Sequence, residues 1–283
     1  MNLSQLLAHF KTELKDVYEE EEVKSIFSIC VEHLLKLKRS SLMMNWDKEV
    51  SPAEEQQFLL VAQGLKAHKP IQYLLGEAYF YGAFFKVNEA VLIPRPETEE
   101  LVDWILENRL DDKSVIDFGT GSGCIAISLK KHGKAAQVTA VDISEVALQL
   151  ASENALRLET EVNFIHADIL NLEIKGQFDV IVSNPPYITG TEMEEMHQNV
   201  LAHEPHLALF VPDERPLLFY EAIADFAVGH LKEKGKLYFE INEYLSEEMI
   251  QMLKDKGFIH IVLKKDMQGK PRMILALRDE MMV

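Results

Sequence analysis

The sequence predicts an α/β fold with a mostly parallel sheet, preceded by a small N-terminal helical domain. Three observations support this prediction. Residues 1–75 show helical spacing of apolar residues and almost no strand signals. From Ser114 onward, short β-rich apolar runs alternate with helical segments, which is typical of a parallel sheet covered on both faces. The last two apolar runs are FIHIVLKK and RMILALR, and the polar stretch between them indicates an antiparallel pair.

Three helices are expected within residues 1–75. Apolar residues at helical spacing define the first two, namely Leu3, Leu6, Leu7 and Phe10, then Val23, Ile26, Phe27, Cys30, Leu34 and Leu37. The third opens at Ser51, where Glu54 completes a capping box, and is expected to end near Gly64 or His68. The acidic run 19–22 is interpreted as a solvated helix start, with an acidic docking patch as the alternative.

Residues 76–93 have a different character, because aromatic residues lie on both sides of Gly82. Two short strands joined by a tight turn have this pattern. We therefore expect a β-hairpin that connects the helical domain, residues 1–75, to a larger domain, residues 94–283. A helix from about Glu97 opens that domain.

The alternation of strand patterns and helical patterns in the larger domain predicts its elements in sequence order. Five parallel strands are expected at SVIDFG, QVTAVDI, VNFIHAD, FDVIVSN and KLYFEIN. With the antiparallel pair, this makes a seven-stranded sheet. Four further helices are expected near residues 125–131, 145–158, 217–231 and 246–256.

Composition excludes several classes of protein. The 283 residues include 29 Lys and Arg against 46 Asp and Glu, a net charge of −17 that disfavours broad binding of a polyanion. Two cysteines cannot form a disulfide framework, and no apolar run approaches the ~18–20 residues that span a bilayer. The first residues lack the apolar segment of a signal peptide. We predict a soluble, cytoplasmic protein without a membrane partner.

A glycine-rich loop between the first strand and the next helix is the first candidate site. It comprises Gly119, Thr120, Gly121, Ser122 and Gly123, which we take as cofactor-binding residues. Glycines allow a tight turn and a close approach to a ligand, and open α/β sheets bind ligands at the carboxyl ends of their strands. A purely structural turn is the alternative.

Acidic residues at the next two strand ends extend this site. Asp142 follows the loop by roughly 20 residues, where a carboxylate can accept hydrogen bonds from a ribose diol. The alternative is that it only caps the following helix, although Ser144 is available for that. The Asp168 carboxylate could accept a hydrogen bond from the exocyclic amino group of an adenine, while Ile169 packs on the adenine ring. These residues favour an adenosine-containing ligand, without distinguishing a nicotinamide dinucleotide from S-adenosylmethionine.

The fourth strand runs into Asn184-Pro185-Pro186-Tyr187, the candidate catalytic and substrate-binding element. The alternative is an ordinary strand-ending turn. Methyl transfer to a planar nitrogen explains the combination better, because an amide lone pair is delocalised and both N–H groups must be held by acceptors. Asn184, which also adjoins the cofactor, offers its side-chain oxygen, and Pro185 offers a carbonyl on a rigid frame. Tyr187 can pack on the amide. Catalysis is then positioning plus electrostatics.

A set of motifs spread over nearly the whole chain carries a family resemblance. They are Tyr73 to Glu77, Phe80 to Gly82, Val87-Asn88, Leu92 to Glu99, Asp117 to Gly123, Val141 to Ser144, Ser183 to Ile188, Glu204-Pro205 and Ala208-Leu209. With these motifs the sequence resembles the HemK/PrmC family of protein-(glutamine) methyltransferases. Asn-Pro-Pro-Tyr is shared with enzymes that methylate adenine amino groups, whereas the segment from Ile93 to Glu99 is more particular to the release-factor family.

The resemblance implies a Rossmann-like methyltransferase domain that uses S-adenosyl-L-methionine and no metal. It implies transfer of a methyl group to the amide of a GGQ-type glutamine in peptide chain release factors, giving N5-methylglutamine and S-adenosylhomocysteine. Residues 1–75 would then recognise the protein substrate, with no direct nucleic-acid partner. Two alternatives stay open: an adenine-amino methyltransferase acting on DNA or RNA, and a non-enzymatic module that binds an adenosine ligand.

Three further features receive structural interpretations. His203, Glu204 and His206 could suggest a metal site, but no third matched ligand accompanies the two histidines, and no metal is expected. Two segments depart from the family pattern, residues 210–216 and residues 269–272. Both are expected to lie away from the residues assigned to chemistry.

Overall fold

The computed structural model describes residues 1–171 and 173–278, which form two compact units. The N-terminal unit contains Met1–Glu77 together with His197–His203. The α/β unit contains Ala78–Met196 and the chain from Glu204 onward. A short segment from the second half of the sequence therefore belongs to the first unit, which the sequence did not predict.

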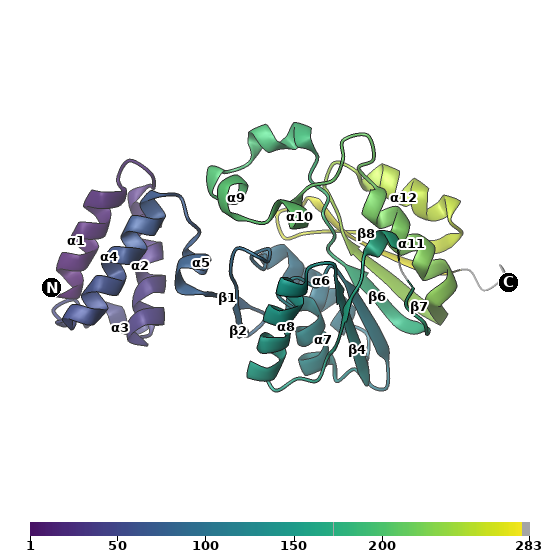
Figure 1. Cartoon of the computed structure of the whole chain (residues 1–283), viewed down its shortest axis with the longest axis horizontal. Coiled ribbons are helices and arrows are strands. Elements are labelled where there is room, and N and C mark those ends of the chain that lie inside the picture. Colours follow the sequence, from purple (N-terminus) through teal and green to yellow (C-terminus); the bar gives the residue numbers. More distant parts are fainter. Residues whose placement is uncertain (172, 279–283) are drawn as a thin grey trace. The chain divides into compact units, whose positions relative to one another are not determined.

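The N-terminal unit is helical, as predicted (Figure 1). Its helices are α1 (Leu3–Leu14), α2 (Glu20–Leu35), α3 (Arg39–Leu42), α4 (Pro52–Lys66), α5 (Ile71–Leu75) and α9 (Gln198–His203). The expected capping box opens α4, since the Ser51 N–H donates to Glu54 Oε2 at 2.7 Å and the Glu54 N–H donates to Ser51 Oγ at 3.3 Å. Aromatic rings of Phe10, Phe27 and Phe58 meet in its core, with centroids 5.3 to 6.0 Å apart.

The α/β unit contains the predicted seven-stranded sheet. Its strands are β3 (Ser114–Phe118), β4 (Gln137–Asp142), β5 (Asn163–His166), β6 (Phe178–Ser183), β7 (Leu231–Glu240), β8 (Phe258–Lys265) and β9 (Pro271–Arg278). They lie in the order β5-β4-β3-β6-β7-β9-β8. The first five are parallel, and β9 is antiparallel to both of its neighbours. The strand order reverses beside β3, where open α/β sheets bind their ligands.

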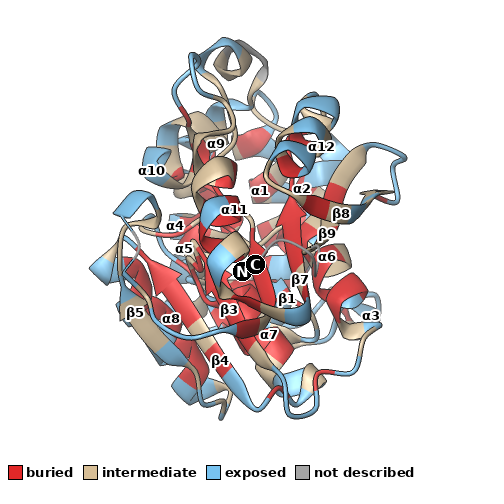
Figure 2. Cartoon of the chain, turned by 90° about the vertical axis from the view of Figure 1, so that its right-hand side faces the viewer, coloured by how far each residue is buried: buried red, intermediate tan, exposed pale blue. Residues whose placement is uncertain are grey.

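Helices cover both faces of this sheet. The α-helices of this unit are α6 (Pro96–Leu106), α7 (Cys124–Gly133), α8 (Glu145–Arg157), the short α10 (His206–Leu209), α11 (Leu218–His230) and α12 (Ser246–Asp255), and the longer ones pack on the sheet. Alternation within β3 supplies two cores, because Val115 packs with residues of α6 and α7 whereas Ile116 packs with residues of α11 and α12. Figure 2 shows these buried strands in red beneath their helices.

A two-stranded hairpin, β1 (Glu77–Phe80) and β2 (Ala83–Lys86), occupies the aromatic segment. Its turn places Tyr81 and Gly82 at positive φ, +45° and +80°, a conformation that glycine adopts without steric cost. Both cysteines are buried and free. Among the described residues, no helix combines the length and apolar character that crossing a membrane requires.

Candidate active site

A cavity of about 470 Å³ lies at the carboxyl ends of β3, β4, β5 and β6. Glycines, two acidic residues and Asn184 line it together with apolar side chains, among them Val91, Ile143, Val146, Ile169, Leu170, Leu207 and Phe219. Four strand ends therefore converge on one largely apolar pocket with a few polar groups. Such a pocket suits an organic ligand of nucleoside size.

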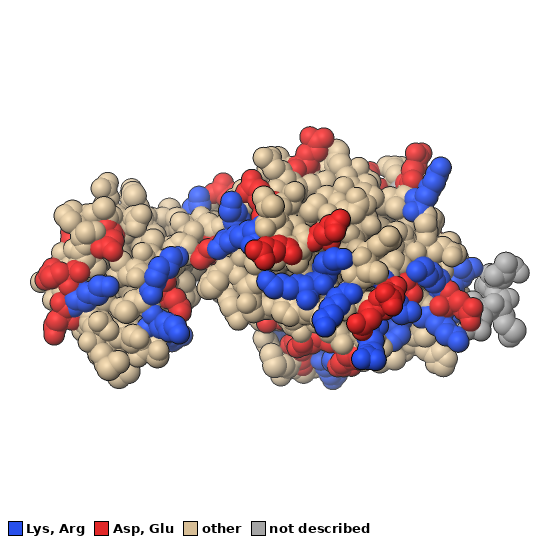
Figure 3. Space-filling model, turned by 90° about the horizontal axis from the view of Figure 1, so that it is seen from below, with Lys and Arg blue, Asp and Glu red and all other residues tan. Residues whose placement is uncertain are grey.

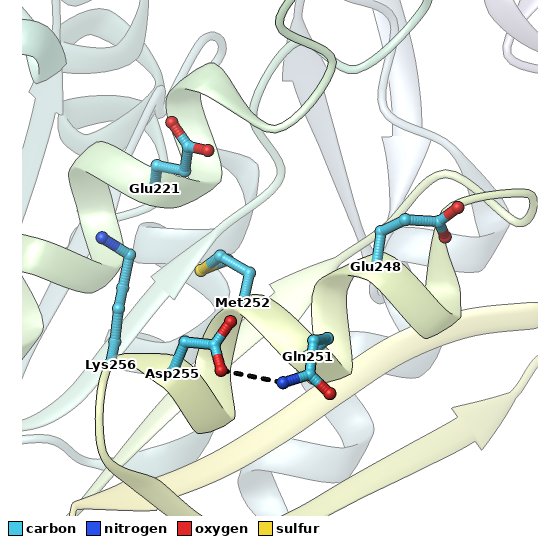
Figure 4. A pocket seen from close by; sticks show the side chains of 6 residues that line it. All are labelled: Glu221, Glu248, Gln251, Met252, Asp255 and Lys256. Atoms are coloured by element: carbon cyan, nitrogen blue, oxygen red, sulfur yellow. Dashed lines mark hydrogen bonds between the residues drawn. The ribbon is translucent and has the colours of Figure 1, made fainter.

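A second hollow of similar volume lies on α11 and α12 (Figure 4). Its lining residues are Glu221, Glu248, Gln251, Met252, Asp255 and Lys256. Gln251 donates to Asp255 Oδ1 at 2.8 Å, so part of its polar surface is already paired. No strand end or glycine loop contributes to its described lining. The pocket at the sheet edge is therefore the candidate site.

The three loop glycines have different structural roles. Gly119, Gly121 and Gly123 all have positive φ, at +69°, +54° and +81°. Gly119 and Gly121 line the pocket, and a Cβ at Gly121 would meet no atom within 4 Å. A Cβ at Gly123 would lie 2.9 Å from Ile127 and 3.1 Å from Ala151 of α8. The first two glycines leave room for a ligand, and the third allows close helix packing.

Thr120 and Ser122 lie in the interior of the loop and do not line the pocket. The Thr120 hydroxyl donates to Oδ2 of Asp117 at 2.6 Å. Asp117 is fully buried, and burial raises the pKa of its carboxyl to about 7. Oδ1 of Asp117 and the Ser122 hydroxyl find no hydrogen-bond partner among the described residues. The part of Thr120 and Ser122 in the site is therefore to shape the glycine loop.

Asp142 connects β4 to the glycine loop. Its Oδ2 accepts from the Gly121 N–H and its Oδ1 from the Ser144 N–H, both at 2.9 Å. The cap of α8 is the Ser144 hydroxyl, which accepts from the Ala147 N–H at 3.2 Å. Asp142 also lines the pocket, and each of its oxygens retains a second acceptor position for a ligand. Its burial raises the pKa of the carboxyl.

Asp168 and Ile169 both line the pocket. The Asp168 carboxylate accepts from the Leu170 N–H and from the Asn171 side chain, each at 2.9 Å. These bonds fix the 3₁₀ helix η1 (Ile169–Asn171). The apolar side chains of Ile169 and Leu170 are thereby held at the pocket wall.

The Asn-Pro-Pro-Tyr element follows β6, and two of its four residues line the pocket, Asn184 and Pro186. Pro185 is buried, and the Tyr187 hydroxyl donates to Oε1 of Glu240 at 3.4 Å. Tyr187 is directed to the protein interior rather than to the pocket, although the sequence suggested that its ring packs on a substrate amide.

Two residues that the sequence did not identify join this element. Nδ2 of Asn184 donates to Oγ1 of Thr98 at 3.3 Å, and the Thr98 hydroxyl donates to Oε2 of Glu240 at 2.7 Å. The parallel register pairs Ser183 with Phe239, so Asn184 and Glu240 follow side by side. Burial raises the pKa of the Glu240 carboxyl to about 7, opposed by the Thr98 hydrogen bond and by the charge of Arg272.

Among the described residues, neither of the two departures from the family pattern contributes to the lining of the pocket, but both lie near the chain that follows Asn184. Val211 donates its N–H to the Ile188 carbonyl at 2.9 Å, and Asp213 accepts from the Gly190 N–H at 2.5 Å. The segment 210–216 thus holds the chain that leaves Tyr187. In the second segment, Arg272 influences the pKa of both Tyr187 and Glu240.

The two histidines and the glutamate have separate contacts. Glu204 is buried, and its carboxylate accepts from Arg95 Nη2 at 2.5 Å and from the Ile93 N–H at 3.2 Å. His203 belongs to the N-terminal unit, where Nε2 lies 3.2 Å from the Ala67 carbonyl. Over residues 1–171 and 173–278, no group of three His, Cys, Asp or Glu side chains is arranged to hold a metal ion.

Comparison with known proteins gives matches along most of the chain. Residues 97–208 match the family described as methyltransferase small domain, and residues 5–76 match the PrmC N-terminal domain. A release factor glutamine methyltransferase of Flavobacterium psychrophilum is 46% identical over 279 residues, covering 95% of this chain and 98% of that protein. Another, of Bacteroides thetaiotaomicron, is 42% identical over 98% of this chain and 100% of that protein.

Solved structures show the same fold at lower identity. A methyltransferase from Pyrococcus furiosus aligns with a TM-score of 0.55 at 17% identity, over 81% of this chain and 99% of that one. A ribosomal protein L11 methylase from Lactobacillus delbrueckii subsp. bulgaricus aligns with a TM-score of 0.50 at 23% identity, over 68% of this chain and 84% of that one.

Proposed function

The chain belongs to the release factor glutamine methyltransferase family, and we propose that the pocket at its sheet edge is where a release-factor glutamine is methylated. The enzyme class is S-adenosylmethionine-dependent protein-(glutamine-N5) methyltransferase. One observation carries the proposal: Gly119 and Gly121 of the glycine loop, Asp142 and Asn184 all line a single cavity. The methyl-donor elements and the amide-binding element therefore meet at one place.

The residues of the pocket fit S-adenosylmethionine, which supplies an electrophilic methyl group on a sulfonium when bound. Gly119 and Gly121 leave the backbone open for close approach, and the carboxylate of Asp142 has acceptor positions left for a ribose. Ile169 offers an apolar surface for the adenine, and Asp168 supplies a carboxylate at the same wall. Thr120, Ser122 and Gly123 contribute by keeping the loop in shape.

Asn184 and Pro185 are the residues that we assign to the glutamine amide. The side-chain oxygen of Asn184 and the backbone carbonyl of Pro185 accept its two N–H groups, which turns the nitrogen lone pair toward the donor. The amide starts neutral and loses its proton only after transfer, so no general base needs to act first. Pro186 completes the wall beside Asn184. Tyr187 stiffens the element through Glu240.

The N-terminal unit is assigned to recognition of the protein substrate. All residues that line the pocket belong to the α/β unit, as far as the described chain extends. Peptide chain release factors are the proposed partners of the N-terminal unit. The cytoplasm, where such factors act, is the proposed location. On the face that Figure 3 shows, basic and acidic side chains are interspersed, and none of this face forms the basic stripe expected of a nucleic-acid reader.

A methyl-transfer assay with labelled donor tests the proposal. Release factor, a release factor whose GGQ glutamine is changed to alanine, DNA and RNA are offered separately. We expect label only on the intact release factor. Labelled DNA or RNA would instead support the adenine-amino alternative, and donor binding without transfer to any substrate would support a binding module.

A further inference from the structure

The amide of Asn184 can face the pocket in two ways, and only one of them suits the proposed reaction. Its oxygen accepts an N–H from the substrate amide, whereas its NH₂ group would oppose the substrate NH₂. The two orientations have nearly the same shape, so packing alone does not choose between them. A directional hydrogen bond is needed to choose.

Thr98 and Glu240 provide this direction. An ionised carboxylate only accepts hydrogen bonds, and a threonine hydroxyl has one proton to give. The 2.7 Å bond to Glu240 uses that proton, so the Thr98 oxygen is left as an acceptor for Asn184. Asn184 must then turn its NH₂ toward Thr98, which leaves the oxygen as the amide atom available to a ligand in the pocket.

Both groups are shielded from water, which makes the arrangement well defined. Thr98 is 3% exposed and Glu240 is 2% exposed. The charged and titratable groups around the Glu240 carboxylate are Arg272 of β9, Glu97 of α6, Cys124 of α7 and Tyr187, while the Tyr220 hydroxyl of α11 binds the Glu240 carbonyl at 3.1 Å. In so dry an environment a lost partner is costly, so the bonds persist.

We propose that Thr98 and Glu240 are positioning residues that fix the orientation of the Asn184 amide and thereby the binding of the substrate glutamine. This inference rests on the proposed function of Asn184. It assigns a role to two residues outside the Asn-Pro-Pro-Tyr element, one on α6 and the other at the end of β7.

We call the hydrogen-bonded chain from Asn184 through Thr98 to Glu240 the relay. Its hydrogen bonds can also run in the opposite direction. A protonated Glu240 donates to Thr98, Thr98 then donates to Asn184, and the Asn184 amide turns its oxygen away from the substrate. Turnover should therefore fall as the pH drops below about 7, where Glu240 gains its proton. The proposed donor contacts of Gly121 and Asp142 lie outside this chain of hydrogen bonds, so Glu240→Gln should leave donor affinity unchanged at a given pH.

Kinetics of the full-length enzyme with release factor and S-adenosylmethionine test the proposal. Thr98→Val keeps the shape and removes the hydroxyl, and it should lower kcat on the order of 10-fold, the worth of one such hydrogen bond, with donor affinity unchanged. Thr98→Ser should restore most of the loss. Thr139→Val, on β4 and outside the relay, is the matched control and should behave as wild type. Wild-type kcat in Thr98→Val overturns the proposal.

Two further measurements separate the relay from a general packing effect. Glu240→Gln should have a reduced kcat that changes less between about pH 6 and 8 than in the wild type, because a glutamine does not titrate and, of these two carboxyls with a pKa of about 7, only that of Asp117 remains. In an Asn184→Ala background, Thr98→Val should cost nothing more, since the relay acts only through Asn184. A change of kcat with pH in Glu240→Gln as large as in the wild type, or full additivity of Thr98→Val with Asn184→Ala, contradicts the proposal.

A spectroscopic readout is independent of turnover. In protein labelled with ¹⁵N-asparagine, the Asn184 side-chain NH₂ signal is identified by its absence in Asn184→Ala. It should shift with pH around 7 in the wild type and stop doing so in Glu240→Gln. A pH-dependent signal in an enzyme that does not methylate release factor would mean that the proposed function fails while the relay stands. A signal unaffected by Thr98→Val would mean that the relay fails.

Discussion

The backbone N–H of Gly121 donates to Oδ2 of Asp142 at 2.9 Å, so the acidic end of β4 holds the glycine loop in place. The second carboxylate oxygen holds the start of α8 through the Ser144 N–H. Asp142 therefore shapes the donor pocket as well as lining it. Any substitution there changes the loop and the ribose contact together.

Asp142→Ala should weaken S-adenosylmethionine binding and also lower the melting temperature. It removes two charge-assisted hydrogen bonds from a mostly buried position in addition to the proposed ribose acceptor, so the dissociation constant should rise by roughly 10- to 100-fold. Calorimetric titration and thermal unfolding check the two effects. Asp142→Asn retains one acceptor and should fall between alanine and wild type. Unchanged donor affinity in Asp142→Ala would contradict the assignment.

Gly121→Ala should lower both donor affinity and stability, although a Cβ at this position meets no atom. Its φ of +54° costs a non-glycine residue about 1–2 kcal/mol, and the added methyl group enters the space that the ligand needs. Gly229→Ala is the matched control, because its Cβ is also unobstructed but its helical backbone is ordinary. That control should stabilise α11 by about 0.5–1 kcal/mol. Denaturant unfolding gives the free energy of unfolding of both variants. Equal changes in Gly121→Ala and Gly229→Ala would show that the positive φ at Gly121 does not strain an alanine.

The strands and helices of the fold were predictable from local sequence patterns, whereas the site was predictable only in part. Alternating apolar runs identified all seven strands, and strand ends identified Gly121, Asp142 and Asn184, because a parallel sheet gathers its carboxyl ends at one edge. The link from Asn184 to Glu240 through Thr98 depends on the packing of α6 on the sheet, which no local pattern encodes. A pairing register between β6 and β7 would have been needed to find it.

The same limit explains two further differences. The placement of α9 with the N-terminal unit depends on tertiary packing, and its short sequence has no strong helical period. Segment 210–216 contains no recognisable motif, yet it binds the backbone at Ile188 and Gly190. The contact of Val211 with Ile188 joins two backbone groups, which every residue type carries, and the Asp213 carboxylate that binds the Gly190 N–H is of a residue type common on any surface, so neither contact can be recognised in the sequence.

Folding stability should decrease as the pH rises from about 5 to 8. The carboxyls of Asp117 and Glu240 have folded-state pKa values of about 7, above their ordinary values of 3.8 and 4.5. A raised pKa contributes stability that is present at low pH and lost as the pH rises through 7. Asp179 acts in the opposite sense, since its pKa is lowered by Lys232, Ser114 and Lys113, but it titrates below this window.

This expectation is checked by melting temperatures of the wild type, Asp117→Asn and Glu240→Gln at pH 5.5 and at pH 8. Each unit by which folding raises a pKa corresponds to about 1.4 kcal/mol of folding free energy. Each amide variant removes one titration and should flatten the dependence, while the self-repulsion that comes from the net charge of −17 remains. Identical slopes in all three proteins would show that neither carboxyl titrates in this range.

Recognition by the N-terminal unit should be separable from donor binding. Met43 and Met44 are more than 80% exposed at the end of α3. Changing both to serine should raise KM for release factor without altering donor affinity, if apolar contact with the substrate occurs there. Leu156→Ser, an equally exposed apolar residue of the α/β unit, is the control. An unchanged KM for release factor would remove this surface from the docking region.

The central prediction concerns Asn184 itself. Asn184→Ala removes the acceptor for the substrate amide and should lower the single-turnover rate by a factor on the order of 10²–10³, with donor and release factor saturating. The structure also decides what Asn184→Asp should do. The introduced carboxylate has an acceptor for the substrate but no donor for Thr98, and the single Thr98 proton cannot serve both that carboxylate and Glu240.

Asn184→Asp should therefore be about as poor as Asn184→Ala, since two carboxylates then compete for one hydroxyl in a buried site and repel each other. Rates of the two variants within a few-fold of each other support a need for both halves of the amide. An aspartate variant that is ten times faster than the alanine variant would show that the oxygen alone matters and that the contact with Thr98 is dispensable. An alanine variant as fast as wild type would remove Asn184 from the mechanism altogether.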